Sequence, residues 1–277
     1  MRPAVEDGAV KPYPPLADLD ALPGDHFEGS VWVRELVAGE GLRFGVTDGG
    51  YLRFAAGERQ FEADPPLRLR RAVGHVRNRF DVDALASEAS DPTELVFYGV
   101  ATIRDGIEYD WDRLAPFLGF DVWNGARGAW LPNDAVARAF EGLGLEGVNA
   151  FEKELPVRHF YPERYEIPRS AWYDGPAAGV VVRDSHGNRA ARRNPDVERT
   201  SVDLLTDPSD LAAALVTDDL VGRIGSEIGE ETFDALFETT LDETFRLAHP
   251  LVERWDEGER REFRGAVAER VRSFESG

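Results

Sequence analysis

The sequence contains no cysteine and, in 277 residues, only two lysines, Lys11 and Lys153. The first absence excludes disulfide frameworks, thiol catalysis and metal sites with cysteine ligands. The second leaves two candidate amine nucleophiles, because arginine stays protonated and is not nucleophilic. No apolar run approaches the roughly 18 residues that a membrane helix requires, and the N-terminus lacks a signal-peptide core. We therefore expect a cytoplasmic protein with no membrane partner.

Charge is the dominant compositional feature. Asp and Glu number 52 against 32 Lys and Arg, which gives a net charge of −20, and 30 of the basic residues are arginine. Such acidity is typical of proteins that stay soluble in concentrated salt, where screening removes self-repulsion. We expect a halophilic protein from a salt-rich cytoplasm. Hydrophobic residues, at 42%, suffice for a packed core.

The chain divides into three regions by pattern. Residues 1–29 form a lead-in rich in Pro, Gly and Asp, 30–200 alternate strand-like and helical runs, and 201–277 are purely helical. Asn133 is the expected cap of a helix over 133–141, and a second helix is expected over 66–80. The expected strands are 31–33, 42–46, 51–54, 94–103, 119–123 and 179–183.

Three short motifs have structural explanations. Asp48-Gly49-Gly50 predicts a hairpin turn, because Asp and Gly tolerate positive φ. The run 142–147 fits GxGxxG, but it follows a helix rather than a strand, so it predicts a glycine-terminated helix. Asp184-Ser185-His186 are sequence neighbours in an expected hairpin turn, whereas a catalytic triad is assembled in space.

Four segments carry a resemblance to a known family. They are Val31–Phe44, Phe97–Ala101, Ile107–Trp123 and Ala177–Ala191. Taken in order, they resemble motifs of the RNA ligase branch of the covalent nucleotidyltransferases, here of a haloarchaeal type with degenerate catalytic motifs. The resemblance covers about residues 12–200. It implies an α+β fold in which a ligase-type, ATP-grasp-like nucleotidyltransferase domain of antiparallel sheets with flanking helices precedes a small all-α C-terminal domain.

The resemblance also implies where catalytic residues belong. In the family, a lysine attacks the α-phosphate of ATP, and the AMP then passes to a 5′-phosphate end. The matching positions for that lysine, an Asp, two Glu and a last lysine hold Leu36, Ala38, Val100, Ala178 and Ala191. Aliphatic side chains cannot act as the nucleophile or bind phosphate or Mg²⁺. We therefore expect no catalytic residue, no metal site and no cofactor.

Other matched positions suggest a vestigial nucleotide pocket. Phe120 corresponds to the ring on which the base stacks, and Arg43 and Arg183 correspond to positions near the nucleotide. The alternative is a core phenylalanine and two salt-bridged arginines.

Two arginine-rich stretches could contact nucleic acid. One lies in 66–80 and the other after the last expected strand. The alternative is that these arginines pair with the abundant carboxylates. The candidates are Arg68, Arg70, Arg71, Arg77, Arg79, Arg189, Arg192 and Arg193.

These observations favour a non-catalytic, RNA ligase-like protein that binds a partner. The expected partner is RNA, an intact ligase or another RNA-repair protein. The alternative is an ATP-dependent RNA ligase or adenylyltransferase with a displaced nucleophile such as Lys153, which would use ATP and Mg²⁺.

Overall fold

The computed structural model describes residues 10–23, 25–61, 63–197, 207–229 and 232–276, and the chain divides into two compact units. Unit 1 comprises Met1–Asp64, Arg79–Thr102 and Glu108–Glu198, and unit 2 comprises Pro65–Asn78, Ile103–Ile107 and Arg199–Gly277. The expected boundary at residue 200 lies outside the described residues. Two segments that the sequence analysis placed before that boundary, 65–78 and 103–107, group with the C-terminal helices.

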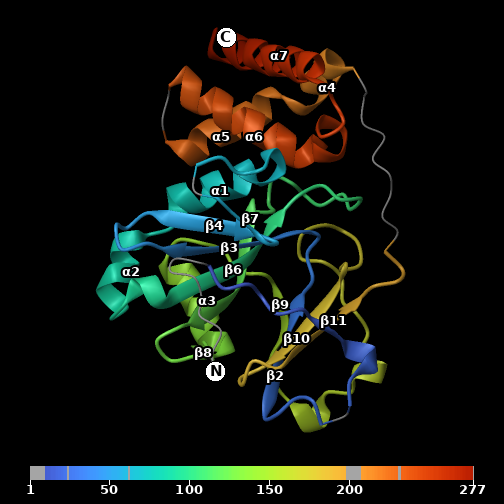
Figure 1. Cartoon of the computed structure of the whole chain (residues 1–277). Helices are drawn as coiled ribbons and strands as arrows, with labels where there is room; N and C mark the ends of the chain where they lie inside the picture. Colours follow the sequence, from blue (N-terminus) through green and yellow to red (C-terminus); the bar gives the residue numbers. More distant parts are fainter. Residues whose placement is uncertain (1–9, 24, 62, 198–206, 230–231, 277) are drawn as a thin grey trace. The chain divides into compact units, whose positions relative to one another are not determined.

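Unit 1 is built on two sheets (Figure 1). The first has the strand order β1-β11-β10-β2-β9, and the second has the order β5-β4-β3-β6-β7-β8. All described strand pairs are antiparallel except β1 with β11, which is parallel. The strands are β1 (Ala17–Asp18), β2 (Ser30–Glu35), β3 (Gly39–Val46), β4 (Leu52–Ala56), β5 (Arg59–Phe61), β6 (Leu95–Thr102), β7 (Phe117–Asn124), β8 (Ala129–Trp130), β9 (Ala150–Pro156), β10 (Gly179–Asp184) and β11 (Arg189–Arg193).

Strands distant in sequence meet in the first sheet. Figure 1 shows blue β2 beside yellow β10, and the register pairs Val33 with Val182. Residues 36–38 lead directly from β2 in the first sheet to β3 in the second. The hairpin predicted at Asp48-Gly49-Gly50 joins β3 to β4, with Gly50 at φ +76°. Positive φ there suits glycine, because it has no Cβ.

Each sheet has its own apolar core. The first buries Val31, Val33, Val180 and Val182, packed with Leu19, Phe27, Phe160 and Ala190. The second is rich in phenylalanine: the rings of Phe44 and Phe97 stack with centroids 5.1 Å apart, and Phe80 meets both edge-on. Consecutive residues of β2, β6 and β10 are buried, so both faces of these strands are covered.

Among the described residues of unit 1, two complete α-helices are present, α2 (Val82–Glu88) and α3 (Asn133–Gly142). Asn133 is not the cap of α3, contrary to the sequence-based prediction. The cap position is Pro132, and the buried Asn133 side chain is bonded to Arg34 and Arg183. Gly144, in the GxGxxG run, follows α3 with φ +80°, so that run ends a helix as predicted.

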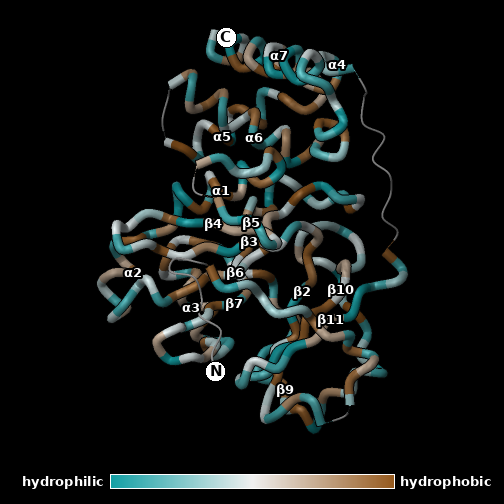
Figure 2. The backbone as a smooth tube through the Cα atoms, viewed as in Figure 1, coloured by the Kyte–Doolittle hydropathy of each residue, from teal (hydrophilic) through white to brown (hydrophobic). Residues whose placement is uncertain are grey.

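Unit 2 contains α1 (Leu67–Arg79) except its last residue, together with α4 (Pro208–Leu215), α5 (Asp218–Ile228), α6 (Phe233–Val252) and α7 (Glu257–Ser276). Figure 2 shows hydrophobic and hydrophilic residues alternating along α5 and α6, and their apolar faces form one core with α4 and α7. Ion pairs bind α1 to these helices, since buried Arg71 contacts Glu227 and Glu243. Among the described helices, none has the length and apolar character to cross a membrane.

Candidate functional site

Four of the five aliphatic positions lie around the passage from β2 to β3. The Leu36 N–H donates to the carbonyl of Gly179 at 3.0 Å, which brings it beside Ala178. A Cβ added to Gly39 would lie 2.6 Å from Cγ2 of Val100, so β6 closes tightly on this passage. Ala38 is buried and its N–H donates to the Tyr109 hydroxyl. The structure thus brings positions from three separate motifs together.

The fifth position lies farther along the first sheet. Ala191 is on β11 and pairs with Val181 of β10. No amine or carboxylate stands at any of the five positions. Among the described residues, no three His, Asp or Glu side chains are grouped in a way that could hold a metal ion.

Both lysines contact aromatic rings instead. Lys11 Nζ lies 4.0 Å from the ring centre of Trp123, and Lys153 Nζ lies 5.1 Å from that of Trp32. Ammonium groups over indole faces are stabilised electrostatically. Lys153 belongs to β9, beside β2, and not to the β2–β3 passage where Leu36 lies.

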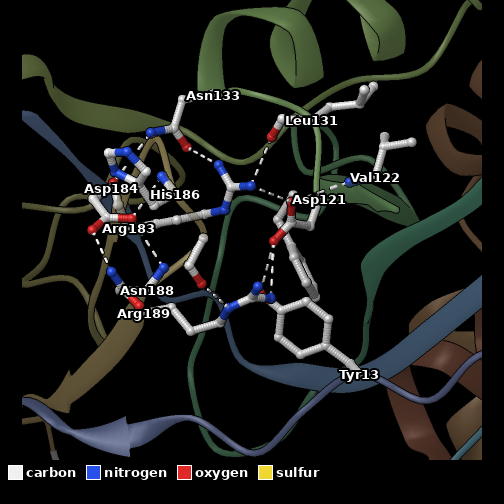
Figure 3. Close-up of polar contacts among 12 residues, drawn as sticks. Tyr13, Asp121, Val122, Leu131, Asn133, Arg183, Asp184, His186, Asn188 and Arg189 are labelled. Atoms are coloured by element: carbon white, nitrogen blue, oxygen red, sulfur yellow. Dashed lines mark hydrogen bonds and ion pairs between the residues drawn. The ribbon is translucent and has the colours of Figure 1, made fainter. Parts of the chain in front are cut away.

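A buried ionic cluster lies between α3, β7, β10 and β11 (Figure 3). The Asp121 carboxylate is fully buried and pairs with Arg183 at 3.1 Å and with Arg189 at 3.2 Å. Arg183 also donates to Asn133 Oδ1 at 2.6 Å and to the carbonyl of Leu131 at 2.7 Å. Arg183, which the sequence analysis placed near a nucleotide, is therefore bonded within the protein, as its salt-bridge alternative predicts.

Arg34 adds a third guanidinium to this cluster. It donates to Asn133 Oδ1 at 2.6 Å and to the carbonyl of Phe120. Burial lowers the pKa of Arg34 to about 10, although the charge of Asp121 opposes that shift. Arg183 and Arg189 thus pair directly with Asp121, whose charge also favours the charged form of Arg34.

Arg43 and Phe120 meet the N-terminal lead-in. Arg43 Nε donates to the carbonyl of Val10 at 3.1 Å, and the ring of Phe120 lies 5.1 Å from that of Tyr13. Two of the three predicted pocket residues, Arg43 and Phe120, therefore contact the same segment, residues 10–13. The chain's own segment contacts them there.

Internal pairs engage several of the predicted nucleic-acid residues. On α1, Arg68 pairs with Glu253 at 2.8 Å and buried Arg71 with Glu243 at 2.7 Å. These pairs are of the kind expected under the alternative interpretation, in which the arginines pair with the protein's own carboxylates. In the same helix, Arg70 is half-buried, whereas Arg77 and Arg79 are exposed.

Two of the three candidate arginines of β11 make internal pairs, and the third is exposed. Arg189 is bonded to Asp121, and Arg192 pairs with Asp20 while donating to the carbonyl of Pro162 at 2.7 Å. Arg193 is exposed at the end of the strand. Contact with RNA stays a prediction, and the exposed arginines are the side chains best placed for it.

One buried acid near Leu36 was missed by the sequence analysis. Glu35 is 2% exposed and accepts hydrogen bonds from Ser170 Oγ, Ala171 N–H and Asn149 Nδ2. It thereby fastens the loop before β10 to the end of β2. Glu35 could have been identified from its place between Arg34 and Leu36 on an expected buried strand, because a buried carboxylate requires hydrogen-bond partners.

Comparisons with known proteins identify a similar fold but do not assign the chain to a family. No family model matches the sequence, and no curated protein matches it. Among solved structures, form 2 of an archaeal ATP-dependent RNA ligase matches with 17% identity and a TM-score of 0.52, over 88% of this chain and 65% of that one. Form 1 matches with 15% identity and a TM-score of 0.50, over 96% and 82%.

This chain thus spans less than two thirds of the form 2 chain. At such identities the similarity concerns architecture alone. The resemblance seen in the sequence motifs is confirmed at that level: antiparallel sheets and helices are arranged in a fold similar to that of ATP-dependent RNA ligases.

Proposed function

We propose that this protein is a non-catalytic member of the RNA ligase fold that binds RNA or a protein of RNA repair. The observation that carries the proposal is the side chain at the position of the nucleophile. Leu36 stands there, and both lysines of the chain have their ammonium groups on tryptophan rings elsewhere. Nucleotidyl transfer through a lysine requires an amine at that position.

The residues present do not fit ATP with Mg²⁺. A divalent ion of this kind prefers oxygen ligands, and phosphates are commonly bound by lysine or arginine. The side chains of Ala38, Val100, Ala178 and Ala191 offer neither. Arg183 has its guanidinium committed to Asp121, Asn133 and a carbonyl group.

A binding role is supported by the exposed arginines. Arg77 and Arg79 end α1, and Arg193 ends β11, in a protein that is otherwise strongly acidic. Local positive charge in such a surface favours an anionic partner such as RNA. Because salt weakens each phosphate contact, binding in a salt-rich cytoplasm would also require shape or stacking.

Self-adenylation is the decisive test of the non-catalytic assignment. The protein is incubated with α-labelled ATP and Mg²⁺ or Mn²⁺ in molar KCl and separated by denaturing electrophoresis. We expect no labelled band from the natural chain, from Lys11→Ala or from Lys153→Ala.

A labelled band that disappears only in Lys153→Ala would instead establish the displaced-nucleophile enzyme. An intact archaeal RNA ligase, run in a buffer in which it is active, verifies the label and the detection. RNA binding is measured separately by filter retention. Arg79→Glu with Arg193→Glu should weaken it, whereas Arg138→Glu, an exposed arginine paired with Asp134, is the control.

A further inference from the structure

Five paired residues form a row across one face of the six-stranded sheet. Residues directly opposite each other on neighbouring strands project from the same face. The row runs from the edge strand β5 to β7, and its members in strand order are Gln60, Ala55, Arg43, Tyr98 and Asp121. Four of these side chains are polar, and the fifth, Ala55, is small and fully buried. The sheet thus presents a line of hydrogen-bonding groups across five strands.

The segment Val10–Tyr13 is held along this row at its backbone. The Val10 N–H donates to Gln60 Oε1 at 3.2 Å, and the Val10 carbonyl accepts from Arg43 Nε at 3.1 Å. The Tyr98 hydroxyl donates to the carbonyl of Lys11 at 2.9 Å. The segment itself belongs to no helix or strand. Side chains of the sheet therefore bind the main chain of the segment as they would bind an extended peptide.

Two side chains of the segment are recognised as well. Lys11 Nζ lies 4.0 Å from the ring centre of Trp123, and the Tyr13 hydroxyl donates to Asp121 Oδ2 at 3.1 Å (Figure 3). The centroid of the Tyr13 ring lies 5.1–5.5 Å from those of three other rings, and a guanidinium lies 4.8 Å from it; these partners are Tyr98, Phe120, Trp130 and Arg189. The site thus takes a lysine and, two residues later, a tyrosine. We call the row and these side chains the segment site.

An exposed connection joins the segment to the rest of the chain. Pro14, Pro15 and Leu16 are all exposed, and β1, which follows them, pairs with β11 in the other sheet. The segment can therefore leave its site without removing any residue of the connection from a core. Two consecutive prolines also favour an extended backbone with little conformational freedom.

We propose that the segment site accepts Val10–Tyr13 of a second copy of this chain, so that two copies exchange their segments. The site itself identifies the occupant, because its groups match this segment one by one and every copy carries the segment. In a reciprocal exchange each copy keeps all the contacts described above, so the loss of translational and rotational freedom is the main cost. This surface is separate from the exposed arginines, so the inference goes beyond the proposed function.

Concentration and salt should control the exchange. A short connection holds the segment near its own site at an effective concentration of about 1 mM, and a second copy competes as its concentration approaches that value. The net charge of −20 on each copy opposes association, and molar KCl screens the repulsion. We therefore expect a dimer whose fraction rises with protein concentration in molar KCl.

Two complementary variants test the proposal. The first, Lys11→Ala with Tyr13→Ala, loses the recognised side chains and keeps the site. The second, Tyr98→Phe with Trp123→Ala, keeps the segment and loses the hydroxyl donor and the ring that Lys11 contacts. Light scattering after gel filtration in molar KCl should show each variant alone as a monomer. An equimolar mixture should double the apparent mass, because the second variant supplies the segment and the first supplies the site.

A chain that carries all four substitutions is the matched control, and its mixture with the first variant should remain monomeric. A mixture of the two folded variants that remains monomeric near 1 mM, with folding verified by near-ultraviolet circular dichroism, would overturn the proposal. Dimers of the first variant alone would also overturn it, because they would assign association to another surface.

A synthetic peptide covers the case in which a variant does not fold. The dimer fraction of the natural chain is measured with excess peptide of residues 9–16, which should convert dimers to monomers by occupying the segment site. The same peptide with Tyr13→Ala should have no effect. Absence of dimers of the natural chain near 1 mM, or dimers that both peptides leave intact, would contradict the exchange. No nucleotide or RNA enters these measurements, so their outcome is independent of the proposed function.

Discussion

The hydroxyl group of Tyr13 donates a hydrogen bond to the buried carboxylate of Asp121, 108 residues later in the chain. The same carboxylate pairs with Arg183 and Arg189. Burial, and then the charge of Asp121, raise the pKa of Tyr13 well above its usual range, so the phenol keeps the proton that it donates. One acid thus links the N-terminal segment to the strands of both sheets.

Replacement of Asp121 should strongly destabilise the protein. In Asp121→Asn, the buried guanidinium groups of Arg34, Arg183 and Arg189 lose their counter-charge, and removal of one partner from a buried pair costs about 3–5 kcal/mol. Urea unfolding in molar KCl measures the change. The control is Asp134→Asn, which breaks an exposed pair with Arg138 and should leave the unfolding curve unchanged. Equal curves for the two variants would contradict the role of Asp121.

Replacement of Glu35 should loosen the loop before β10. In Glu35→Ala, the donors on Ser170, Ala171 and Asn149 lose their buried acceptor, which should cost about 3 kcal/mol. Hydrogen exchange should accelerate at the Ala171 amide. Glu152→Ala, at an exposed position on β9, is the control and should leave that amide protected. Unchanged exchange in Glu35→Ala would show that other contacts hold the loop.

Asp242 should make stability depend on pH near neutrality. Burial raises its pKa from 3.8 to about 7, against the opposing charge of Arg70. A proton is therefore bound more tightly in the folded state. This stabilisation is fully present below the ordinary pKa of 3.8 and is lost as the pH rises through the folded-state pKa of about 7. The free energy of unfolding should therefore fall from about pH 4 to about pH 8.

Asp242→Asn should flatten this pH dependence, because the amide does not ionise. Asp234→Asn, at an exposed position on the same helix, should retain the full decrease. Urea unfolding at a series of pH values compares the variants with the natural chain. A slope that survives in Asp242→Asn would assign the effect to another group.

Salt should stabilise the fold through its net charge of −20. Below about 0.1 M salt, the Debye length exceeds about 10 Å and neighbouring carboxylates repel one another. The melting temperature should therefore rise as KCl increases from about 0.1 M to molar concentrations, and NaCl at equal ionic strength should act alike. Circular dichroism gives the melting curves. A melting temperature independent of salt would contradict this explanation.

Apolar strands were predictable from sequence, and charged edge segments were not. The pattern of β-branched and aromatic residues predicts β2, β6 and β10, in which nearly every residue is buried. β9 carries Glu152, Lys153 and Glu154 and is not among the expected strands. It is a strand because β2 offers it a pairing edge. Such pairing is a tertiary contact that local propensity does not contain.

The sequence by itself determined which reactive side chains this protein contains. Two lysines and no cysteine are facts of composition, and Leu36 is the residue at the position that resembles the motif lysine. Only the tertiary structure decided which charged and aromatic side chains are exposed and which are buried against other residues. Arg183 and Arg193 look alike in sequence, yet one is buried against Asp121 and the other is exposed. Tyr13 is one ring in a proline-rich segment until the fold places Phe120 beside it, because a side chain's surroundings arise from residues far away along the chain.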